Sequence, residues 1–255
     1  MAKWKLFLTT LPYVLVVIII KVIISDGLGF EGLIEFSDVA LVLTGGIFLI
    51  GFMLAGTMAD YKESEKIPAD LACNLETLED TLEQSIAVNK TPLDKTYYRN
   101  AFMDMVNGIN DWILHKKTQA QMYESLTVFT KVIREMELAG VNGSACGKML
   151  GDINSIRKIA SRLAVISRTG FLATGYALLE VLIFCIVMLL MISKFKNHVA
   201  EMIIISFVSL IYFYMYRLIR DIDDPFEYGP EGETGVSEIP LFPMREFIAR
   251  TKNRK

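Results

Sequence analysis

Four long apolar stretches constrain the fold of this chain more than any other feature. Each approaches the roughly 20 apolar residues that a helix needs to cross a hydrocarbon core about 30 Å thick. The stretches are residues 4–24, 39–59, 171–193 and 199–219. Hydrophobic residues make up 53% of the chain, against about 45 to 50% in soluble domains, whereas the charged share of 22% is close to the usual share of about 25%. The apolar excess is therefore concentrated, and the sequence predicts an all-α integral membrane protein with four transmembrane helices and a polar helical region.

The charges that flank the spans predict their orientation. Residues 4–24 are expected to be a retained span, because the run is longer than the apolar part of a signal peptide and no small-residue cleavage site follows it. The loop between the first two spans carries acidic residues and no Lys or Arg, whereas basic residues flank the other ends, with Lys194 and Lys196 as exceptions. The positive-inside rule then places both termini on the cytoplasmic side of an inner or plasma membrane.

The polar part of the chain lies mainly between the second and third spans. Leucines and an isoleucine recur there at three- and four-residue steps, so the second span is expected to continue as one long helix with these residues on one face. They are Leu71, Leu75, Leu78, Leu82 and Ile86. Further helices are expected over about 92–115 and 118–139 and from Ser144, with Thr91 and Ser144 as caps.

The expected division is residues 1–59 for the first two spans, 60–169 for a cytoplasmic helical region, 170–220 for the last two spans and 221–255 for a cytoplasmic tail. Because no flexible linker is visible, the spans and the cytoplasmic helices are expected to form one continuous helical unit. The tail is expected to be mostly irregular.

Motifs for catalysis and nucleic-acid binding are absent from the sequence. It contains no G-x-S-x-G, P-loop, H-E-x-x-H or G-x-G-x-x-G pattern, and its two histidines are unrelated in position. The net charge of −3 provides no basic excess for nucleic acid, and three widely spaced cysteines form neither a zinc pattern nor a disulfide framework. We therefore expect no enzyme, no cofactor and no nucleic-acid partner.

The second span carries the most informative pattern. Thr44, Phe48 and Phe52 are spaced by four, so they lie on one helical face. Glycines on other faces would allow close approach of neighbouring backbones, and they are Gly45, Gly46, Gly51 and Gly56. In a ring of identical subunits the phenylalanine stripe would form a narrow apolar constriction, which can gate by dewetting. The alternative is that both phenylalanines face lipid or pack between helices.

Two motifs resemble those of the bestrophins. Phe48-Leu49-Ile50-Gly51-Phe52 is similar to the Phe-x-x-Gly-Phe of the pore-lining second helix in that family. The run of residues 223–229, Asp-Asp-Pro-Phe-Glu-Tyr-Gly, resembles the Asn/Asp-Pro-Phe-Gly and acidic run that follows the fourth span. The order of elements agrees along the whole chain, although the specific similarity covers only about a dozen residues.

The resemblance implies a homo-oligomer, typically a pentamer, around one ion path with an apolar neck. Phe48 and Phe52 match the two neck phenylalanines. Thr44 matches the position one turn before them, where the family usually has an aliphatic residue, so a wetter outer neck is expected. Animal members are calcium-activated anion channels, whereas prokaryotic relatives are cation-permeable and lack the calcium clasp.

Several charged and polar residues extend this interpretation. An acidic outer mouth would attract cations, and its residues are Asp26, Glu31, Glu35 and Asp38. A polar continuation of the pore into the cytoplasm is expected at Asp60, Tyr61 and Ser64. Asp223, Asp224 and Glu227 are weak calcium candidates, but an exposed acidic tail is the favoured interpretation of this run.

Two ionisable residues lie within or close to the spans. Glu180 is expected either to pair with Arg217 of the antiparallel fourth span or to face headgroups, because a charge at membrane depth is costly. Lys21 is expected to extend its ammonium to the membrane surface.

The leading hypothesis is therefore a homo-oligomeric ion channel in contact with lipid and inorganic ions, with cations favoured over anions. The alternative is a non-conducting membrane scaffold or sensor whose cytoplasmic helices bind a partner.

Overall fold

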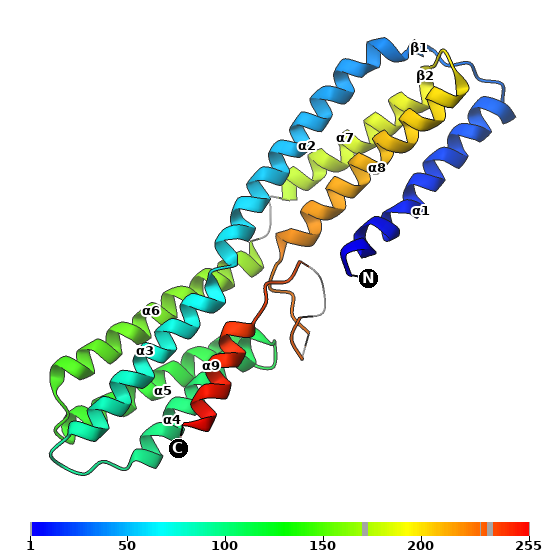
Figure 1. The fold of residues 1–255 in the computed structure, drawn as a ribbon. Helices are drawn as coiled ribbons and strands as arrows, with labels where there is room; N and C mark the ends of the chain where they lie inside the picture. The colour runs from blue at the N-terminus through cyan, green and yellow to red at the C-terminus, as the bar shows by residue number, and fades with distance from the viewer. Residues whose placement is uncertain (1, 170–172, 230, 234–236, 255) are drawn as a thin grey trace. The chain divides into compact units, whose positions relative to one another are not determined.

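The computed structural model describes residues 2–169, 173–229, 231–233 and 237–254, and the chain is 81% helical (Figure 1). Among the described residues, four helices are long and apolar enough to cross a membrane. The all-α fold with four spans is thus confirmed. The third expected span begins at Phe171, but residues 171 and 172 lie outside the described part of the chain.

The chain divides into two compact units rather than the one continuous unit that was expected. The first unit comprises Met1–Tyr61 and Thr169–Asp224, and the second comprises Lys62–Arg168 and Pro225–Lys255. Each unit is therefore built from two separate parts of the sequence.

The first unit contains the four candidate spans and a short two-stranded sheet. Its elements are α1 (Ala2–Val22), a π-helical turn (Ile23–Gly27), β1 (Ile34–Glu35), α2 (Phe36–Ser64, which crosses the unit boundary), α7 (Ala173–Ile192), β2 (Ser193–Lys194) and α8 (His198–Asp223). β1 and β2 are parallel, with Ile34 opposite Ser193 and Glu35 opposite Lys194. The core lies among α2, α7 and α8, where Ile50, Ile186 and Tyr212 are almost fully buried.

The second span does not continue as one uninterrupted helix. α2 ends at Ser64, a turn occupies Glu65 and Lys66, and α3 (Ile67–Val88) begins anew with Pro68 in its first turn. Proline has no backbone N–H, so it cannot donate the helical hydrogen bond to the residue four positions earlier. The expected single helix is therefore divided at this point.

The second unit is a bundle of helices around a continuous core. Its remaining elements are α4 (Lys95–Ile113), α5 (Gln119–Leu138), α6 (Gly143–Arg168) and α9 (Phe242–Asn253). The stripe expected on α3 faces this core, since Leu71, Leu75, Leu78 and Leu82 are at most 1% exposed. Ile86, at the end of the stripe, is half-buried.

The helix starts follow local hydrogen bonds that differ in part from those expected. Asp94, not Thr91, caps α4, because its Oδ1 accepts hydrogen bonds from the N–H groups of Thr96 and Tyr97 at 3.0 and 3.1 Å. The Asn142 Oδ1 atom accepts from the Ser144 N–H at 2.8 Å, so Asn142 takes the capping role expected of Ser144. A side-chain acceptor placed before the first turn satisfies donors that the helix itself leaves free.

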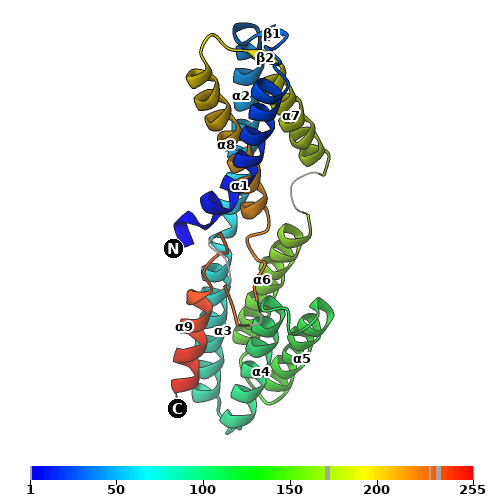
Figure 2. The same cartoon turned by 90° about the vertical axis from the view of Figure 1, so that its right-hand side faces the viewer.

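The tail contains a helix where mostly irregular chain was expected. α9 lies alongside α3 (Figure 2). Met244, Phe247 and Thr251, spaced by three and four, are at most 1% exposed. The amphipathic pattern is only three turns long, and two prolines, Pro240 and Pro243, lie just before it and in its first turn, which is why the sequence signal was weak. Residues 230, 234–236 and 255 of the tail lie outside the described residues.

Candidate ion path on helix α2

Helix α2 has one face that packs within the first unit. Its buried positions, spaced by three and four, are Val39, Leu43, Gly46, Ile50, Met53 and Thr57. Gly46 lies on the same face, where an added Cβ would overlap the Tyr212 hydroxyl oxygen and would come within 2.7 Å of the Ile186 Cδ1 atom. This glycine therefore allows the close approach of α2 to α7 and α8, and the rotation of α2 about its axis is fixed.

The opposite face of α2 carries the residues expected to line a neck. Phe48 and Phe52 are 76% and 72% exposed in the isolated chain, and Thr44 is also exposed. The Thr44 hydroxyl donates to the Ala40 carbonyl of its own helix at 2.9 Å. The structure thus places the three side chains together on a face that no other part of the described chain covers.

The other three glycines of α2 do not provide packing inside the chain. A Cβ added to Gly45, Gly51 or Gly56 would meet no atom within 4 Å. Among the four glycines of α2, only Gly46 allows another helix of the subunit to approach closely. The other three are small residues with open space around them, and they lie beside the phenylalanine stripe.

The expected polar continuation of this face is only partly formed. Asp60 is exposed and Tyr61 is half-exposed, but Ser64 is completely buried. Helical spacing gives the face on which a residue lies and not the elements that cover that face, and in the subunit Ser64 is covered although its spacing places it on this face.

The acidic residues that precede α2 or lie in its first turn are at the surface, as an acidic mouth requires. Asp26, Glu31, Glu35 and Asp38 are all exposed. Lys194 of β2 forms a 3.8 Å ion pair with Glu31, and both side chains are solvent-accessible. One of the four negative charges is therefore partly offset by the lysine that also opposed the orientation rule.

Of the two alternatives for Glu180, the pair with Arg217 is not formed, and each residue has another contact. The Glu180 carboxylate accepts a hydrogen bond from the Tyr216 hydroxyl at 2.8 Å. Arg217 donates to the Thr9 carbonyl of α1, and its guanidinium lies 5.6 Å from the centre of the Tyr13 ring. The heights along the two helices agree, but successive residues of a helix differ by about 100° in direction, and Arg217 faces α1 instead of α7.

Lys21 is buried, contrary to the expectation of a surface-seeking side chain. Only 1% of the residue is exposed, and its Nζ atom lies 2.9 Å from Glu201 Oε1. The sequence offers one signal for this pair, because Glu201 lies in the first turn of the last span at the same end as Lys21.

The weak calcium candidates do not form a metal cluster. Among the described residues, no three His, Cys, Asp or Glu side chains are grouped so that they could hold a metal ion. Asp223 accepts a hydrogen bond from the Tyr176 hydroxyl at 2.9 Å. Glu233, farther along the acidic run, binds the Leu241 N–H and Arg245. Burial opposes its ionised form, but these hydrogen bonds prevail and lower the pKa of Glu233.

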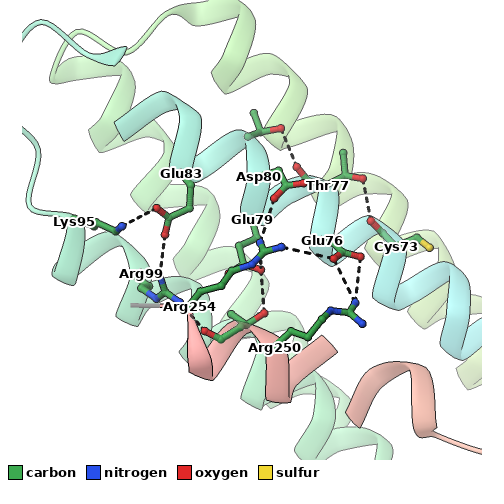
Figure 3. Close-up of polar contacts among 12 residues, drawn as sticks. Cys73, Glu76, Thr77, Glu79, Asp80, Glu83, Lys95, Arg99, Arg250 and Arg254 are labelled. Atoms are coloured by element: carbon green, nitrogen blue, oxygen red, sulfur yellow. Dashed lines mark hydrogen bonds and ion pairs between the residues drawn. The ribbon is translucent and has the colours of Figure 1, made fainter. Parts of the chain in front are cut away.

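A charged cluster in the second unit was not foreseen from the sequence. Figure 3 shows acidic side chains of α3 facing basic side chains of α4 and α9. Arg254 lies 3.2 Å from both Glu79 and Asp80, and Arg250 lies 3.3 Å from Glu76. On the other side of the cluster, Glu83 lies 3.0 Å from Arg99 and 3.1 Å from Lys95.

Glu79 is the buried member of this cluster, with 2% of the residue exposed. Its Oε2 accepts from the Thr251 hydroxyl at 2.9 Å, whereas its Oε1 has no hydrogen-bond partner among the described residues. Burial raises the pKa of Glu79 above its usual value, although the bond from Thr251 and the charges of Arg254 and Arg99 oppose the shift. The cluster therefore holds α9 against α3, with one incompletely satisfied carboxylate at its centre.

No family model matches the sequence, and no curated protein matches it. Solved structures nevertheless share its fold. A crystal structure of a bacterial bestrophin homologue from Klebsiella pneumoniae, phased from zinc, matches with a TM-score of 0.76 at 13% identity over 93% of this chain and 95% of that chain. A point mutant of the homologue from the same organism matches with a TM-score of 0.77 at 13% identity over 95% and 97% of the two chains.

A further crystal structure, described only as that of a membrane protein mutant, matches with a TM-score of 0.77 at 13% identity over 94% of this chain and 95% of that chain. None of these three is described as an enzyme. At such low sequence identity the match shows a shared fold only, because function depends on the residues of the site. The chain therefore has the fold of the bacterial bestrophin homologues, as its two motifs and its order of elements predicted.

Proposed function

We propose that this chain is one subunit of a homo-oligomeric ion channel in which α2 lines the path and Phe48 and Phe52 form an apolar neck. The observation that carries the proposal is the two-sided character of α2. One face is buried against α7 and α8, while the opposite face presents two large aromatic rings one turn apart that no described part of the chain covers.

The three glycines with open space around them favour a ring of subunits rather than a monomer in the lipid bilayer. Small residues are enriched where membrane helices approach one another closely, and Gly45, Gly51 and Gly56 have free space beside them in the subunit. A neighbouring α2 would fill that space. Five copies are favoured by the resemblance to bestrophins, and the mass of the purified protein in detergent tests this number.

Cations are the favoured ions, because the acidic mouth would be repeated in every subunit. A concentrated negative field raises the local concentration of cations, and it is screened beyond about 10 Å at 0.1 M salt. The preference should therefore weaken as ionic strength rises. A reversal potential on the chloride side, recorded with unequal KCl across a planar bilayer, would contradict cation preference.

The neck is tested by replacing Phe48 and Phe52 together by Ala. An ion in a dry apolar gap loses hydration without compensation, so removal of the rings should raise resting conductance several-fold. The matched control replaces Phe184 of α7 and Phe207 of α8, which are 66% and 61% exposed, by Ala. Both variants delete two exposed rings, and only the first is expected to change conduction.

Unchanged single-channel current in an intact oligomer of the Phe48→Ala, Phe52→Ala variant would remove α2 from the ion path. The scaffold hypothesis would then be favoured. A monomer in detergent would contradict the channel proposal as a whole.

A further inference from the structure

A buried ammonium group joins three helix ends of the first unit. The Lys21 Nζ atom lies 2.9 Å from Glu201 Oε1 and 3.1, 3.3 and 3.4 Å from the carbonyl oxygens of Met191, Ser193 and Leu190. Lys21 lies in the last turn of α1, Glu201 lies in the first turn of α8, and two of the carbonyls belong to the last turn of α7.

The placement of both charges is favourable for helices. Cations are stabilised by the free carbonyls at a helix C-terminus and anions by the free N–H groups at an N-terminus. Burial of an unpaired charge is costly, so a buried lysine is retained only where partners satisfy it. Glu201 also has His198 close by, with Nδ1 3.3 Å from Oε2.

A chain of aromatic contacts leads from Lys21 to the start of α2. The Nζ atom lies 5.6 Å from the centre of the Phe195 ring, which is within the range of a cation–π contact. Phe195 stacks on Phe36, with ring centres 4.9 Å apart and an angle of 27° between the planes. Phe36 is the first residue of α2.

A backbone connection leads to the same place. Ser193, whose carbonyl contacts Lys21, lies opposite Ile34 in the β1–β2 pair, and the Leu33 N–H donates to the Ile192 carbonyl at 2.8 Å. Gly32 has a φ of +92°, and a Cβ there would lie 2.7 Å from the Lys194 backbone nitrogen. The segment before α2 is therefore tightly seated on the segment that Lys21 holds.

We propose that Lys21 and Glu201 are positioning residues that fix the first turn of α2, and with it Glu35 and Asp38, at the mouth of the ion path. The role in conduction rests on the proposed function. The contact of β1 with β2 does not rest on the proposed function, and it can be measured without recording any ion current.

The test uses the register partners Glu35 and Lys194. Both are replaced by Cys in a full-length background in which Cys73, Cys146 and Cys185 are replaced by Ala, and the rate of disulfide formation under mild oxidation is followed in liposomes. Lys21→Met should slow cross-linking at least ten-fold, because β2 loses its anchor. Lys5→Met, which removes an exposed lysine near the other end of α1, should leave the rate unchanged.

A second variant separates positioning from the burial of an orphaned charge. Lys21→Met with Glu201→Gln leaves no unpaired charge, but it still lacks the bonds to the three carbonyls. Cross-linking that is slower in this double variant than in the wild type supports the proposal. This holds even if the Lys21→Met variant alone does not fold. A wild-type rate in either variant, even with a lower melting temperature, would overturn the proposal by reducing the pair to a stabilising contact.

Discussion

The Tyr212 hydroxyl of α8 donates a 2.7 Å hydrogen bond to the backbone carbonyl of Leu43 in α2. Gly46 lies beside this contact and leaves room for the tyrosine ring. Because Tyr212 is 1% exposed and Leu43 is 5% exposed, the bond is formed inside the first unit, and it determines which face of α2 is turned outward.

Gly46→Ala is expected to destabilise the protein by about 1 to 3 kcal/mol, the usual cost of an added methyl group in a packed core. The new Cβ would overlap the Tyr212 hydroxyl, so Tyr212→Phe added to Gly46→Ala should recover part of the loss. Gly151→Ala provides the control, because a Cβ at Gly151 meets no atom within 4 Å. Thermal unfolding measures all three variants, and equal melting temperatures for Gly46→Ala and Gly151→Ala would contradict this packing of α2 against α8.

Gly51→Ala is expected to leave the subunit folded and to weaken the oligomer. The position is open within the chain, and Ala is the better helix former by about 1 kcal/mol, so the isolated subunit has no reason to lose stability. Only a neighbouring copy would be displaced by the new methyl group. The fraction of oligomer at falling protein concentration in detergent gives the answer, and an unchanged fraction would place Gly51 away from the subunit interface.

Glu79 is expected to make stability depend on pH. Burial raises the pKa of this carboxyl in the folded protein, so the folded state binds the proton more tightly than the unfolded state does. The contribution to stability is full below the unfolded value near 4.5 and is lost as pH rises through the raised folded pKa.

The comparison is between the wild type and Glu79→Gln at pH 5.5 and 7.5. The wild type should gain melting temperature on acidification relative to Glu79→Gln, which has no proton to bind at this position. Glu246→Gln, which removes an exposed carboxylate from α9, controls for the loss of one negative charge. The same pH response in wild type and Glu79→Gln would show that the burial of this carboxyl has no effect on its titration in solution.

The attachment of α9 is expected to depend on its apolar face more than on its arginines. Phe247 is 1% exposed and meets the Phe102 ring edge to face with centres 6.4 Å apart, so Phe247→Ala should cost about 3 to 5 kcal/mol. Arg250 and Glu76 are both partly exposed, and such a pair contributes about 0 to 1 kcal/mol. Limited proteolysis of the tail and thermal unfolding are measured for Phe247→Ala and Arg250→Ala. A larger loss of stability or of protease resistance in Arg250→Ala than in Phe247→Ala would contradict this prediction.

The features that the sequence predicted well are those in which one helix carries the whole signal. The spacing of Leu71, Leu75, Leu78 and Leu82 gave the buried face of α3, and the spacing of Phe48 and Phe52 gave a common face of α2. Both follow from the helical period, which requires no knowledge of the neighbouring elements.

The features that were missed depend on which elements meet. Lys21 and Glu201 lie in different spans, and the pairing of Glu180 depended on a rotation that the helical rise does not specify. Ser64 carries the right spacing and is nevertheless covered. Periodicity describes a helix by itself, whereas burial and pairing are properties of the assembled unit.

The interleaving of the two units has a consequence for the synthesis of the chain. The carbonyl of Ser193 that contacts Lys21 follows it by 172 residues, and the whole part Lys62–Arg168 of the second unit is made in between. At a synthesis rate of roughly 5 to 20 residues per second, α1 waits on the order of ten seconds or longer in the membrane for the partners of its lysine. During that interval Lys21 lacks both the Glu201 carboxylate and the carbonyl groups that contact it in the folded protein. Lipid headgroups, water or the insertion machinery must therefore solvate the lysine charge until α7 and α8 have been made.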